Sequence, residues 1–306
     1  MEQFSRRYIN LVRHPKERIL YIISVIISII ALAVVISLIA EEVNTFRQNM
    51  IEIAKEQGVS VDDMTLEEVG ELISDTWYDP KNQGNIQIYL TVVALYLLTV
   101  AVLEYYYAII RSNAVRVTPD QFGDIYDLAE QYAYILGLKK TPEIYLIQQN
   151  GVLNAFASNI IRKKYITINI DLLEIGYRQY KDMESIGFIL GHEMSHIKLR
   201  HLSIWVRYTV MLAEVLPIIG PALSRVREYS CDRLSQAVSK NDGIEAMMAL
   251  TMGKHLYKRT NVADYIESTG CVRGFWTWLV NLNSSHPILP KRVRALSNPA
   301  IPGKLF

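Results

Sequence analysis

The chain has 306 residues, half of them hydrophobic and 21% charged, with 10 prolines and 15 glycines. This composition excludes a disordered, collagenous or low-complexity protein. The 32 basic and 31 acidic residues give a formal net charge of +1, so the whole chain has no electrostatic basis for binding nucleic acid. With only two cysteines, Cys231 and Cys271, disulfide bonds are not expected to hold the fold.

The first apolar run lies behind a basic segment. Residues 1–18 carry five basic and two acidic side chains, and the 22 residues at 19–40 carry no charge. At about 1.5 Å per residue, a helix of that length crosses a hydrocarbon core about 30 Å thick. A cleaved signal peptide has a shorter apolar region of about 7 to 15 residues. We therefore predict an uncleaved transmembrane helix at 19–40 rather than a signal peptide or a buried core helix.

A second apolar run, residues 86–110, predicts another transmembrane helix. Its first 18 residues are uncharged, and three consecutive tyrosines follow Glu104, as expected near lipid headgroups. The loop between the runs, residues 41–85, has three basic and eleven acidic side chains, whereas residues 111–306 have 24 and 17. The positive-inside rule therefore predicts a multi-pass protein of the cell membrane, with residues 1–18 and the domain 111–306 in the cytoplasm and 41–85 outside.

The domain at 111–306 has the pattern of a mainly helical α+β fold. Thr118-Pro119 is typical of a helix start, and apolar residues at helical spacing continue to Leu136, before Gly137. Short β-type runs and then a long helix follow. The strands are expected at Glu143–Ile147, Val152–Ala157 and Tyr165–Ile170, and the helix at Asp182–His201.

The long helix carries the sequence His192-Glu193-Met194-Ser195-His196. Its two histidines lie one turn apart on the same helix face, where both imidazoles can bind one zinc ion. Glu193 then lies beside the metal, where it can take a proton from a bound water and later deliver it to a leaving amine. In a chain with only 6 histidines this pattern rarely arises by chance.

The third zinc ligand is expected on a later helix. The long metzincin pattern needs a glycine and a histidine where this chain has Leu199 and Leu202, so it is excluded. Glu228 and Asp232 follow about 30 residues later and share one helix face, so Glu228 can bind the ion while Asp232 accepts the outer N–H of a ligand histidine. We predict one zinc ion per chain, bound by His192, His196 and Glu228.

Three further residues, Cys231, His201 and His286, carry side chains that can bind metal or donate a hydrogen bond. Cys231 lies about 100° around the helix from Glu228 and is expected to be a small buried residue. His201 lies five residues after His196, off the metal face, and is expected to have a structural or surface role. In Ser285-His286-Pro287, the rigid proline could fix the imidazole of His286 so that it donates to the oxyanion of a tetrahedral intermediate.

With these motifs, residues 118–296 resemble peptidase family M48, the membrane zinc metallopeptidases that include the HtpX heat-shock proteases and the CAAX prenyl proteases. The resemblance rests on the motif at 192–196, the Glu228/Asp232 pair, Asn154-Ala155-Phe156, and His286-Pro287 followed by Arg292. It implies the ligands named above, Glu193 as the base, and transition-state stabilisation by His286. It further implies that the strand Asn154–Phe156 lines the cleft and pairs with substrate, and that Arg292 pairs with a carboxylate.

The segment 204–223 is apolar but is not expected to cross the membrane. Only 31 residues separate His196 from Glu228, and both must reach one ion, so a single crossing would separate the ligands and two crossings would need about 40 helical residues. Here the chain departs from the HtpX-type members that it resembles, which usually carry two further spans between the histidine motif and the third ligand. The segment is expected either to pack over the cleft and dip into the membrane interface, or to form a core helix of the domain.

Together these patterns predict two N-terminal transmembrane helices followed by a mainly helical gluzincin-like zinc metalloprotease domain with a small β-sheet. We expect a membrane-anchored endopeptidase that acts on membrane or membrane-proximal proteins in quality control. The alternative is a non-catalytic membrane-bound zinc protein that serves as a scaffold or sensor. An exopeptidase would need a charged group to hold a substrate terminus, and the sequence identifies none. The expected partners are a protein or peptide substrate and the lipid bilayer, without nucleic acid.

Overall fold

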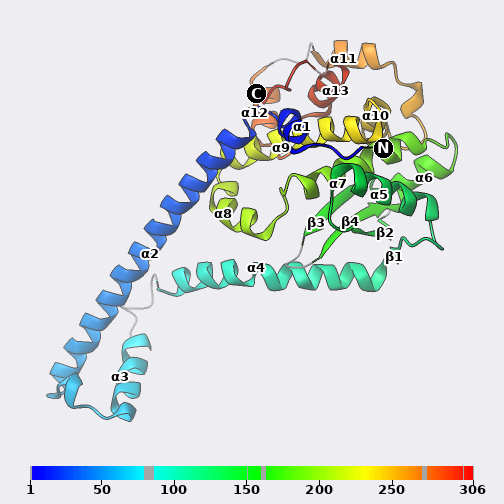
Figure 1. The fold of residues 1–306 in the computed structure, drawn as a ribbon. Helices are drawn as coiled ribbons and strands as arrows, with labels where there is room; N and C mark the ends of the chain where they lie inside the picture. The colour runs from blue at the N-terminus through cyan, green and yellow to red at the C-terminus, as the bar shows by residue number, and fades with distance from the viewer. Residues whose placement is uncertain are drawn as a thin grey trace. The chain divides into compact units, whose positions relative to one another are not determined.

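The computed structural model describes residues 2–78, 86–149, 151–159, 163–270, 274–298 and 300–305. The chain divides into two compact units, one formed by Met1–Ser28 with Glu104–Phe306 and the other by Ile29–Leu103. Most described residues are helical (Figure 1). In chain order the elements are α1 (Arg6–Val12), α2 (Glu17–Glu56), a 3-10 turn (Val61–Asp63), α3 (Leu66–Tyr78), α4 (Ile86–Asn113), β1 (Val115–Arg116), α5 (Gly123–Leu136), β2 (Glu143–Ile147), β3 (Ala155–Asn159), β4 (Lys164–Asn169), α6 (Ile170–Tyr177), α7 (Met183–Lys198), α8 (Ile204–Glu214), α9 (Ile219–Ser239), α10 (Ile244–Met252), a second 3-10 turn (Tyr257–Arg259), α11 (Val262–Gly270), α12 (Phe275–Asn283) and α13 (Leu289–Ser297).

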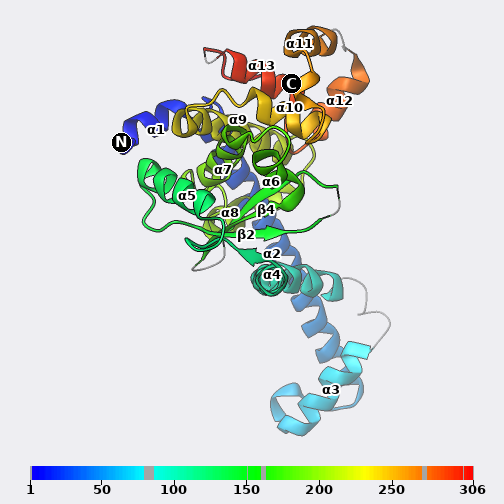
Figure 2. The same ribbon diagram turned by 90° about the vertical axis from the view of Figure 1, so that its right-hand side faces the viewer.

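A small mixed sheet organises the larger unit, with strand order β1-β2-β4-β3. Strands β2 and β4 run parallel, while β1 and β3 are antiparallel to their neighbours at the two edges. Alternate side chains of β2 and β4 face opposite sides of the sheet. Ile144, Leu146 and Ile166 join the main core with α5, α6 and α7, whereas Tyr145 and Tyr165 pack against Tyr107 of α4. The last turns of α4 lie on the side of the sheet opposite α7 (Figures 1 and 2).

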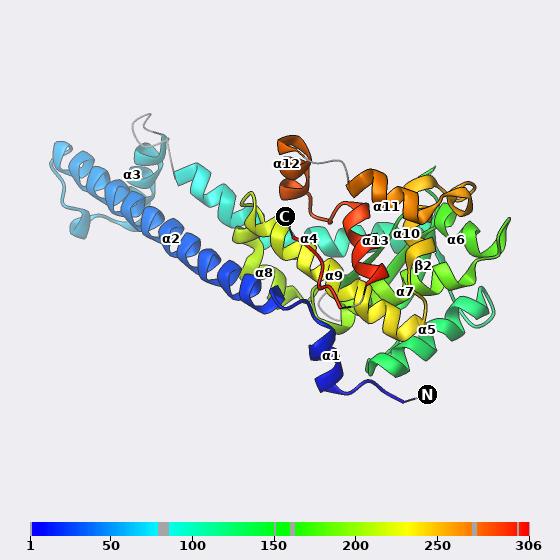
Figure 3. The ribbon, with the colours of Figure 1, turned by 90° about the horizontal axis from the view of Figure 1, so that it is seen from above.

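Helices α7 and α9 pack side by side in the centre of this unit (Figure 3). The side chain of Asp182 caps the start of α7 by accepting the backbone N–H of Ser185 at 2.9 Å. Gly191 lets the two helices approach closely, because a Cβ at that position would lie 2.8 Å from Ser235 Oγ of α9. This close packing fixes the two helices that carry the predicted metal ligands.

The start of α2 belongs to the same unit and packs against α8 and α9. Leu20, Tyr21 and Val25 contact a buried cluster formed by Val210, Leu223, Val226, Tyr229, Ala295 and Leu305. The hydroxyl groups of Tyr21 and Thr209 lie 3.2 Å apart, and Ser28 Oγ accepts the backbone N–H of Ala213 at 3.1 Å. The first turns of the predicted membrane helix therefore pack against helices of the domain at 111–306.

The segment 204–223 is divided between α8 and α9 instead of forming one long helix. The buried apolar side chains of this segment are those of Val210, Ala213, Ala222 and Leu223, whereas Trp205 and Val215 are 78% and 79% exposed. The segment thus has a buried face, as a core helix would, and exposed apolar residues, as an interfacial segment would, so both alternatives stay predictions.

The second unit contains the remainder of α2, the first part of α4, and α3. Helix α3 starts with a capping box: Thr65 N donates to Glu68 Oε2 at 2.7 Å, and Glu68 N donates to Thr65 Oγ1 at 3.4 Å. The rings of Phe46 and Trp77 lie 6.3 Å apart and join α3 to α2.

The two predicted membrane helices differ in the structure. Helix α2 is long and apolar enough to cross a membrane, whereas α4 satisfies the same criteria only as a bent pair, Tyr89–Thr99 and Ala101–Asn113, with 41° between the parts. By length and composition the described residues thus contain one candidate span near the N-terminus, or two if the bent pair is counted.

Several predicted boundaries were wrong. Thr118 does not start a helix but forms a bridge with Gln121, and α5 begins after Phe122, which has a left-handed backbone with φ of 59°. Strand β3 begins at Ala155 rather than Val152. Helix α7 ends at Lys198, so His201 lies in the following turn. Cys231 is a buried free thiol as predicted, and Cys271 lies outside the described residues.

Candidate metal centre

The residues predicted to carry the chemistry converge on one cavity of about 430 Å³ in the larger unit. Its floor comes from α7 and α9, and its rim comes from β3, the residues just before that strand, and the segment around Pro287. Among the side chains that line it are all but one of the predicted site residues, namely Asn154, Ala155, Phe156, His192, Glu193, His196, Glu228 and His286. The exception, Asp232, lies behind His192 and is only 2% exposed.

Three candidate ligand side chains meet on the cavity floor. His192 Nε2 lies 3.2 Å from His196 Nε2 and 3.4 Å from Glu228 Oε2, and His196 Nε2 lies 3.3 Å from Glu228 Oε1. The histidines are brought together by their one-turn spacing on α7, and Glu228 is brought to them by the packing of α9 on α7.

This donor set fits a zinc ion. Tetrahedral coordination with bonds of about 2.0 to 2.1 Å places ligand atoms about 3.3 to 3.4 Å from one another. The two imidazole nitrogens lie 3.2 Å apart, and each faces one oxygen of the Glu228 carboxylate, at 3.4 Å from His192 and 3.3 Å from His196, close to that spacing. Two imidazoles and one carboxylate are also a donor set of catalytic zinc sites, in which the fourth position remains open.

Asp232 and Arg292 support the ligands from behind. His192 Nδ1 lies 2.9 Å from Asp232 Oδ1, so Asp232 is placed to hold the ring with Nε2 towards the other donors. Arg292, from α13, donates from Nε to Asp232 Oδ2 at 2.9 Å and from Nη2 to Oδ1 at 2.5 Å, and its Nη1 lies 3.4 Å from Glu228 Oε2. This is the ion pair that the resemblance implied for Arg292.

Neighbouring charges and hydrogen bonds keep the carboxylates of Glu228 and Asp232 ionised. Burial alone would raise the pKa of Glu228, but its contacts with His192 and His196 lower the pKa well below its usual value. Burial likewise opposes ionisation of Asp232, and the guanidinium of Arg292 overcomes it and lowers the pKa. For His192, burial favours the neutral ring, but Asp232 and Glu228 raise its pKa to about 10. A metal ion bound here would displace that proton.

Glu193 lies beside the three donors and is held by the sheet. Its Oε2 accepts the backbone N–H of Ala157 in β3 at 2.7 Å. Burial raises the pKa of Glu193 above its ordinary value, because a carboxylate is poorly solvated there. A raised pKa suits a carboxylate that must first accept and then release a proton.

His286 and residues 154–156 lie at the rim of the cavity. His286 is 65% exposed at its side chain, and its Nε2 lies 3.6 Å from Glu228 Oε1. Its Nδ1 lies 3.1 Å from Ser285 Oγ. Asn154 is exposed, and Ala155 and Phe156 are half-buried at the start of β3, the edge strand nearest α7.

The sequence interpretation of His201 missed its contact with the site. His201 is 6% exposed, and its Nδ1 lies 3.2 Å from His196 Nδ1 and 3.5 Å from Cys231 Sγ. His196, His201 and Cys231 form a second group of metal-type donors within 4.8 Å of one another. Helical spacing cannot find this contact because α7 has ended before His201. No other pattern in the sequence around Arg200 and His201 indicates that His201 contacts His196.

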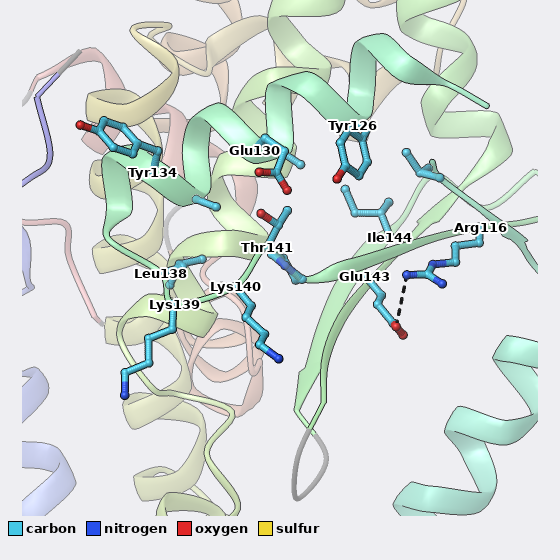
Figure 4. Close-up of a pocket in the computed structure, with 14 residues that line it drawn as sticks. Arg116, Tyr126, Glu130, Tyr134, Leu138, Lys139, Lys140, Thr141, Glu143 and Ile144 are labelled. Carbon is cyan, nitrogen blue, oxygen red and sulfur yellow. Dashed lines mark ion pairs between the residues drawn. The ribbon is translucent and has the colours of Figure 1, made fainter. Parts of the chain in front are cut away.

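A second cavity, of about 460 Å³, lies between α5 and the strands β1 and β2 (Figure 4). Its lining mixes charges of both signs, including Arg116, Glu130, Lys139, Lys140 and Glu143. None of the predicted site residues lines it. The cavity that holds the histidines and glutamates is therefore the candidate active site, although it is slightly smaller.

Two histidines one turn apart, a glutamate from a second helix and an adjacent glutamate define a site of the metallopeptidase class. The chain belongs to peptidase family M48: the family model matches residues 119–218 and 203–300, which together make up more than half of the chain. A search of curated proteins found no match to this chain.

Proposed function

We propose that this protein is a membrane-anchored zinc endopeptidase that cleaves membrane or membrane-proximal proteins. The observation that carries the proposal is the convergence of His192, His196 and Glu228 at tetrahedral spacing, with Glu193 beside them in an open cavity. When bound, zinc supplies a Lewis acid that polarises a carbonyl and lowers the pKa of water. A purely structural zinc site normally has four protein ligands. It would need neither an open fourth position nor the buried carboxylate of Glu193 beside the ligands.

In this proposal Glu193 is the general base. It accepts a proton from the attacking water and passes it to the nitrogen of the leaving amine, so that no covalent enzyme intermediate forms. The N–H of Ala157 fixes one carboxylate oxygen, which orients the group during both transfers. His286, on the rim near Glu228, donates a hydrogen bond to the oxygen of the scissile carbonyl as negative charge develops there.

The edge strand β3 is proposed to bind substrate backbone. Only one side of β3 pairs with a strand, because β4 is its neighbour and β3 ends the sheet order. The N–H of Ala157 is used by Glu193, so backbone alternation places the groups of Ala155 at the same open edge and those of Phe156 towards β4. An extended peptide that adds to this edge passes directly over the metal ligands. Such a main-chain mode suits an endopeptidase, since it needs no terminal charge.

The anchor is proposed to be residues 19–40, with residues 86–110 as a second span and the catalytic domain in the cytoplasm. Support comes from the exposed isoleucines of α2, among them Ile22, Ile26 and Ile29, each more than half exposed. Helix α8 packs on the first turns of this span and exposes Trp205. An interfacial position of the α8–α9 segment would therefore bring membrane-proximal substrate to the cavity.

The decisive experiment compares wild type with Glu193→Gln and Glu228→Ala in detergent or lipid nanodiscs. Glu193→Gln should retain zinc and lose peptide hydrolysis, whereas Glu228→Ala should bind zinc much more weakly. Zinc content by mass spectrometry and cleavage of an unfolded protein substrate are the two measurements. Equal cleavage by wild type and Glu193→Gln would contradict the base and favour a scaffold or sensor. Zinc bound equally tightly by Glu228→Ala would contradict the third ligand.

A further inference from the structure

A chain of buried polar contacts leads from the start of α2 to the metal ligand His196. Glu17 Oε1 lies 3.1 Å from His201 Nε2, and His201 Nδ1 lies 3.2 Å from His196 Nδ1. His196 then presents its other nitrogen, Nε2, to His192 and Glu228. Glu17 and His201 are only 4% and 6% exposed. The contacts therefore lie in the interior, where their hydrogen bonds do not compete with water.

The turn after α7 brings His201 back against the helix. Arg200 has a left-handed backbone with φ of 64°, and its N–H donates to Ile197 O at 3.3 Å. The N–H of His201 donates to His196 O at 3.1 Å. This pair of hydrogen bonds is the Schellman ending of a helix, which places the residue after the left-handed position beside the last turn. The backbone itself thus sets His201 next to His196.

Glu17 is fixed by contacts on its other sides. Its carboxylate accepts a hydrogen bond from Ser230 Oγ and forms an ion pair with Arg13. Arg13 also donates to Leu199 O at 2.9 Å, and the N–H of His14 donates to Ser230 Oγ at 2.9 Å. The short segment between α1 and α2 is therefore tied to both helices that carry the metal ligands.

The order of donors and acceptors along the series of contacts from Glu17 through His201 to His196 determines which nitrogen of each imidazole ring carries hydrogen. The ionised carboxylate of Glu17 can only accept, so His201 donates from Nε2–H. Neutral His201 then has a lone pair on Nδ1 and accepts the Nδ1–H of His196. With its hydrogen on Nδ1, His196 has a free lone pair on Nε2, which is the nitrogen that faces His192 and Glu228. Any other neutral arrangement would place two lone pairs or two hydrogens between a pair of facing atoms.

We propose that Glu17 and His201 are positioning residues that hold His196 in the tautomer and orientation needed to bind the metal. The inference rests on the zinc site of the proposed function and deepens it. Glu17 lies two residues before the predicted first membrane span at 19–40, so the start of the anchor is connected to a proposed metal ligand through one intervening histidine. Partners that orient ligand histidines in this way usually contribute 10- to 100-fold to metal affinity or activity.

A competing interpretation is a second metal ion held by His196, His201 and Cys231. That ion would need His196 to bind metals through both ring nitrogens, which requires the ring to lose both of its hydrogens. It would also need a thiolate, and burial raises the pKa of Cys231 well above its usual value. The chain of hydrogen bonds needs only neutral rings and is the interpretation that the geometry favours. The number of bound ions separates the two.

The test measures the zinc affinity of the full-length protein in detergent, by competition with a chelator. Glu17→Leu removes the acceptor at similar size and should weaken zinc binding 10- to 100-fold, while Glu17→Gln, which keeps an acceptor oxygen, should recover part of that loss. Asp182→Asn is the matched control, because Asp182 is another buried carboxylate on the same domain and contacts no ligand. It should lower thermal stability and leave zinc affinity unchanged. The absorption spectrum of the cobalt-substituted protein should change in Glu17→Leu and not in Asp182→Asn.

A measurement on the wild-type protein keeps the inference testable if Glu17→Leu does not fold. Nitrogen NMR of histidine-labelled, zinc-loaded protein should find hydrogen on Nε2 of His201 and on Nδ1 of His196. Hydrogen on Nδ1 of His201 would overturn the inference, as would equal zinc affinity in Glu17→Leu and Asp182→Asn. Two zinc ions per chain, one of them lost in Cys231→Ala, would establish the competing second site. A wild-type protein that binds no zinc would overturn both this inference and the proposed function.

Discussion

Arg292 and Asp232 form a buried two-point ion pair directly behind a candidate metal ligand. The guanidinium donates to both carboxylate oxygens, at 2.9 and 2.5 Å, and one of these oxygens lies 2.9 Å from Nδ1 of His192. The pair joins α13, near the end of the chain, to α7 and α9, the helices that carry the candidate ligands. Asp232 is therefore fixed before any metal arrives, and the ring of His192 is oriented by a group that cannot itself move freely.

Replacement of Asp232 by asparagine should weaken zinc binding about 10- to 100-fold, because the amide no longer provides a charged acceptor for His192 Nδ1–H. The variant should also unfold at lower temperature, since Arg292 loses its partner in a buried position. Chelator competition measures the zinc affinity, and circular dichroism measures the unfolding. A variant with lower stability and wild-type zinc affinity would restrict Asp232 to a structural role.

A second prediction concerns the N–H that Ala157 donates to Glu193. Ala157→Pro removes this donor at the open edge of β3, where a proline disturbs no strand pairing. Hydrogen bonds to charged groups contribute about 1.5 to 3 kcal/mol, so kcat should fall about 10- to 100-fold while zinc remains bound. Ala155→Pro is the matched control at the same edge, two residues away. Because Ala155 is proposed to pair with substrate, this change should mainly raise KM.

Steady-state kinetics with a fluorogenic peptide separates the two effects. The same kcat for Ala157→Pro and wild type would mean that the amide does not orient the base. A KM effect in both variants and no kcat effect in either would indicate that β3 binds substrate but does not position Glu193.

The convergence of the candidate metal ligands could be predicted in part from the sequence because much of their geometry is local. His192 and His196 are placed by one turn of a helix, and Glu228 and Asp232 share a face of another, so spacing alone constrains each pair. Strand β2 was predicted with its observed bounds, Glu143–Ile147, because Pro142 and an uninterrupted run of strand-forming residues mark it.

The contacts around His201 could not be predicted in the same way. The sequence has no glycine at the end of α7, and the left-handed turn is made by Arg200, so the predicted helix extends three residues too far and its spacing does not reveal the contact between His201 and His196. Glu17 lies 184 residues away in the chain and reaches His201 only through tertiary packing. The start of α5 was missed for a related reason, since Phe122 adopts the left-handed conformation that precedes the helix.

A third prediction concerns Asp182, which caps α7 and so supports the helix that carries both histidines. It accepts hydrogen bonds from the backbone N–H of Ser185 at 2.9 Å, from Ser185 Oγ at 2.7 Å and from the hydroxyl of Tyr257 at 2.8 Å. Burial alone would raise its pKa, but these hydrogen bonds and nearby Lys258 lower the pKa below the ordinary value of 3.8. A carboxyl group with a lowered folded-state pKa contributes stability above its unfolded pKa and loses that contribution as the pH falls through the folded value.

Asp182→Asn should therefore be less stable than wild type by about 1 to 2 kcal/mol near neutral pH, and the difference should shrink below about pH 4. Denaturant unfolding of the zinc-free proteins at several pH values gives this difference without interference from metal release. A stability difference that stays constant from pH 7 to pH 3 would show that the charge of Asp182 contributes nothing to the cap.

The last prediction concerns membrane topology. It uses two exposed positions, Ser60, which precedes α4 in the sequence, and Lys140, which follows it. Residues 1–18 carry five basic and two acidic side chains, whereas residues 41–85 carry three and eleven, so the first segment should remain in the cytoplasm and the second should be exported. In a Cys271→Ser background, where the remaining Cys231 is buried, a membrane-impermeant maleimide should label Ser60→Cys in intact cells. It should label Lys140→Cys only after the membrane is opened.

Labelling of both positions in intact cells would mean that α4 does not cross, and the reverse pattern would place the catalytic domain outside. Either result would change the expected substrates while leaving the metal site intact, because all three proposed ligands follow residue 140 and lie in one packed unit.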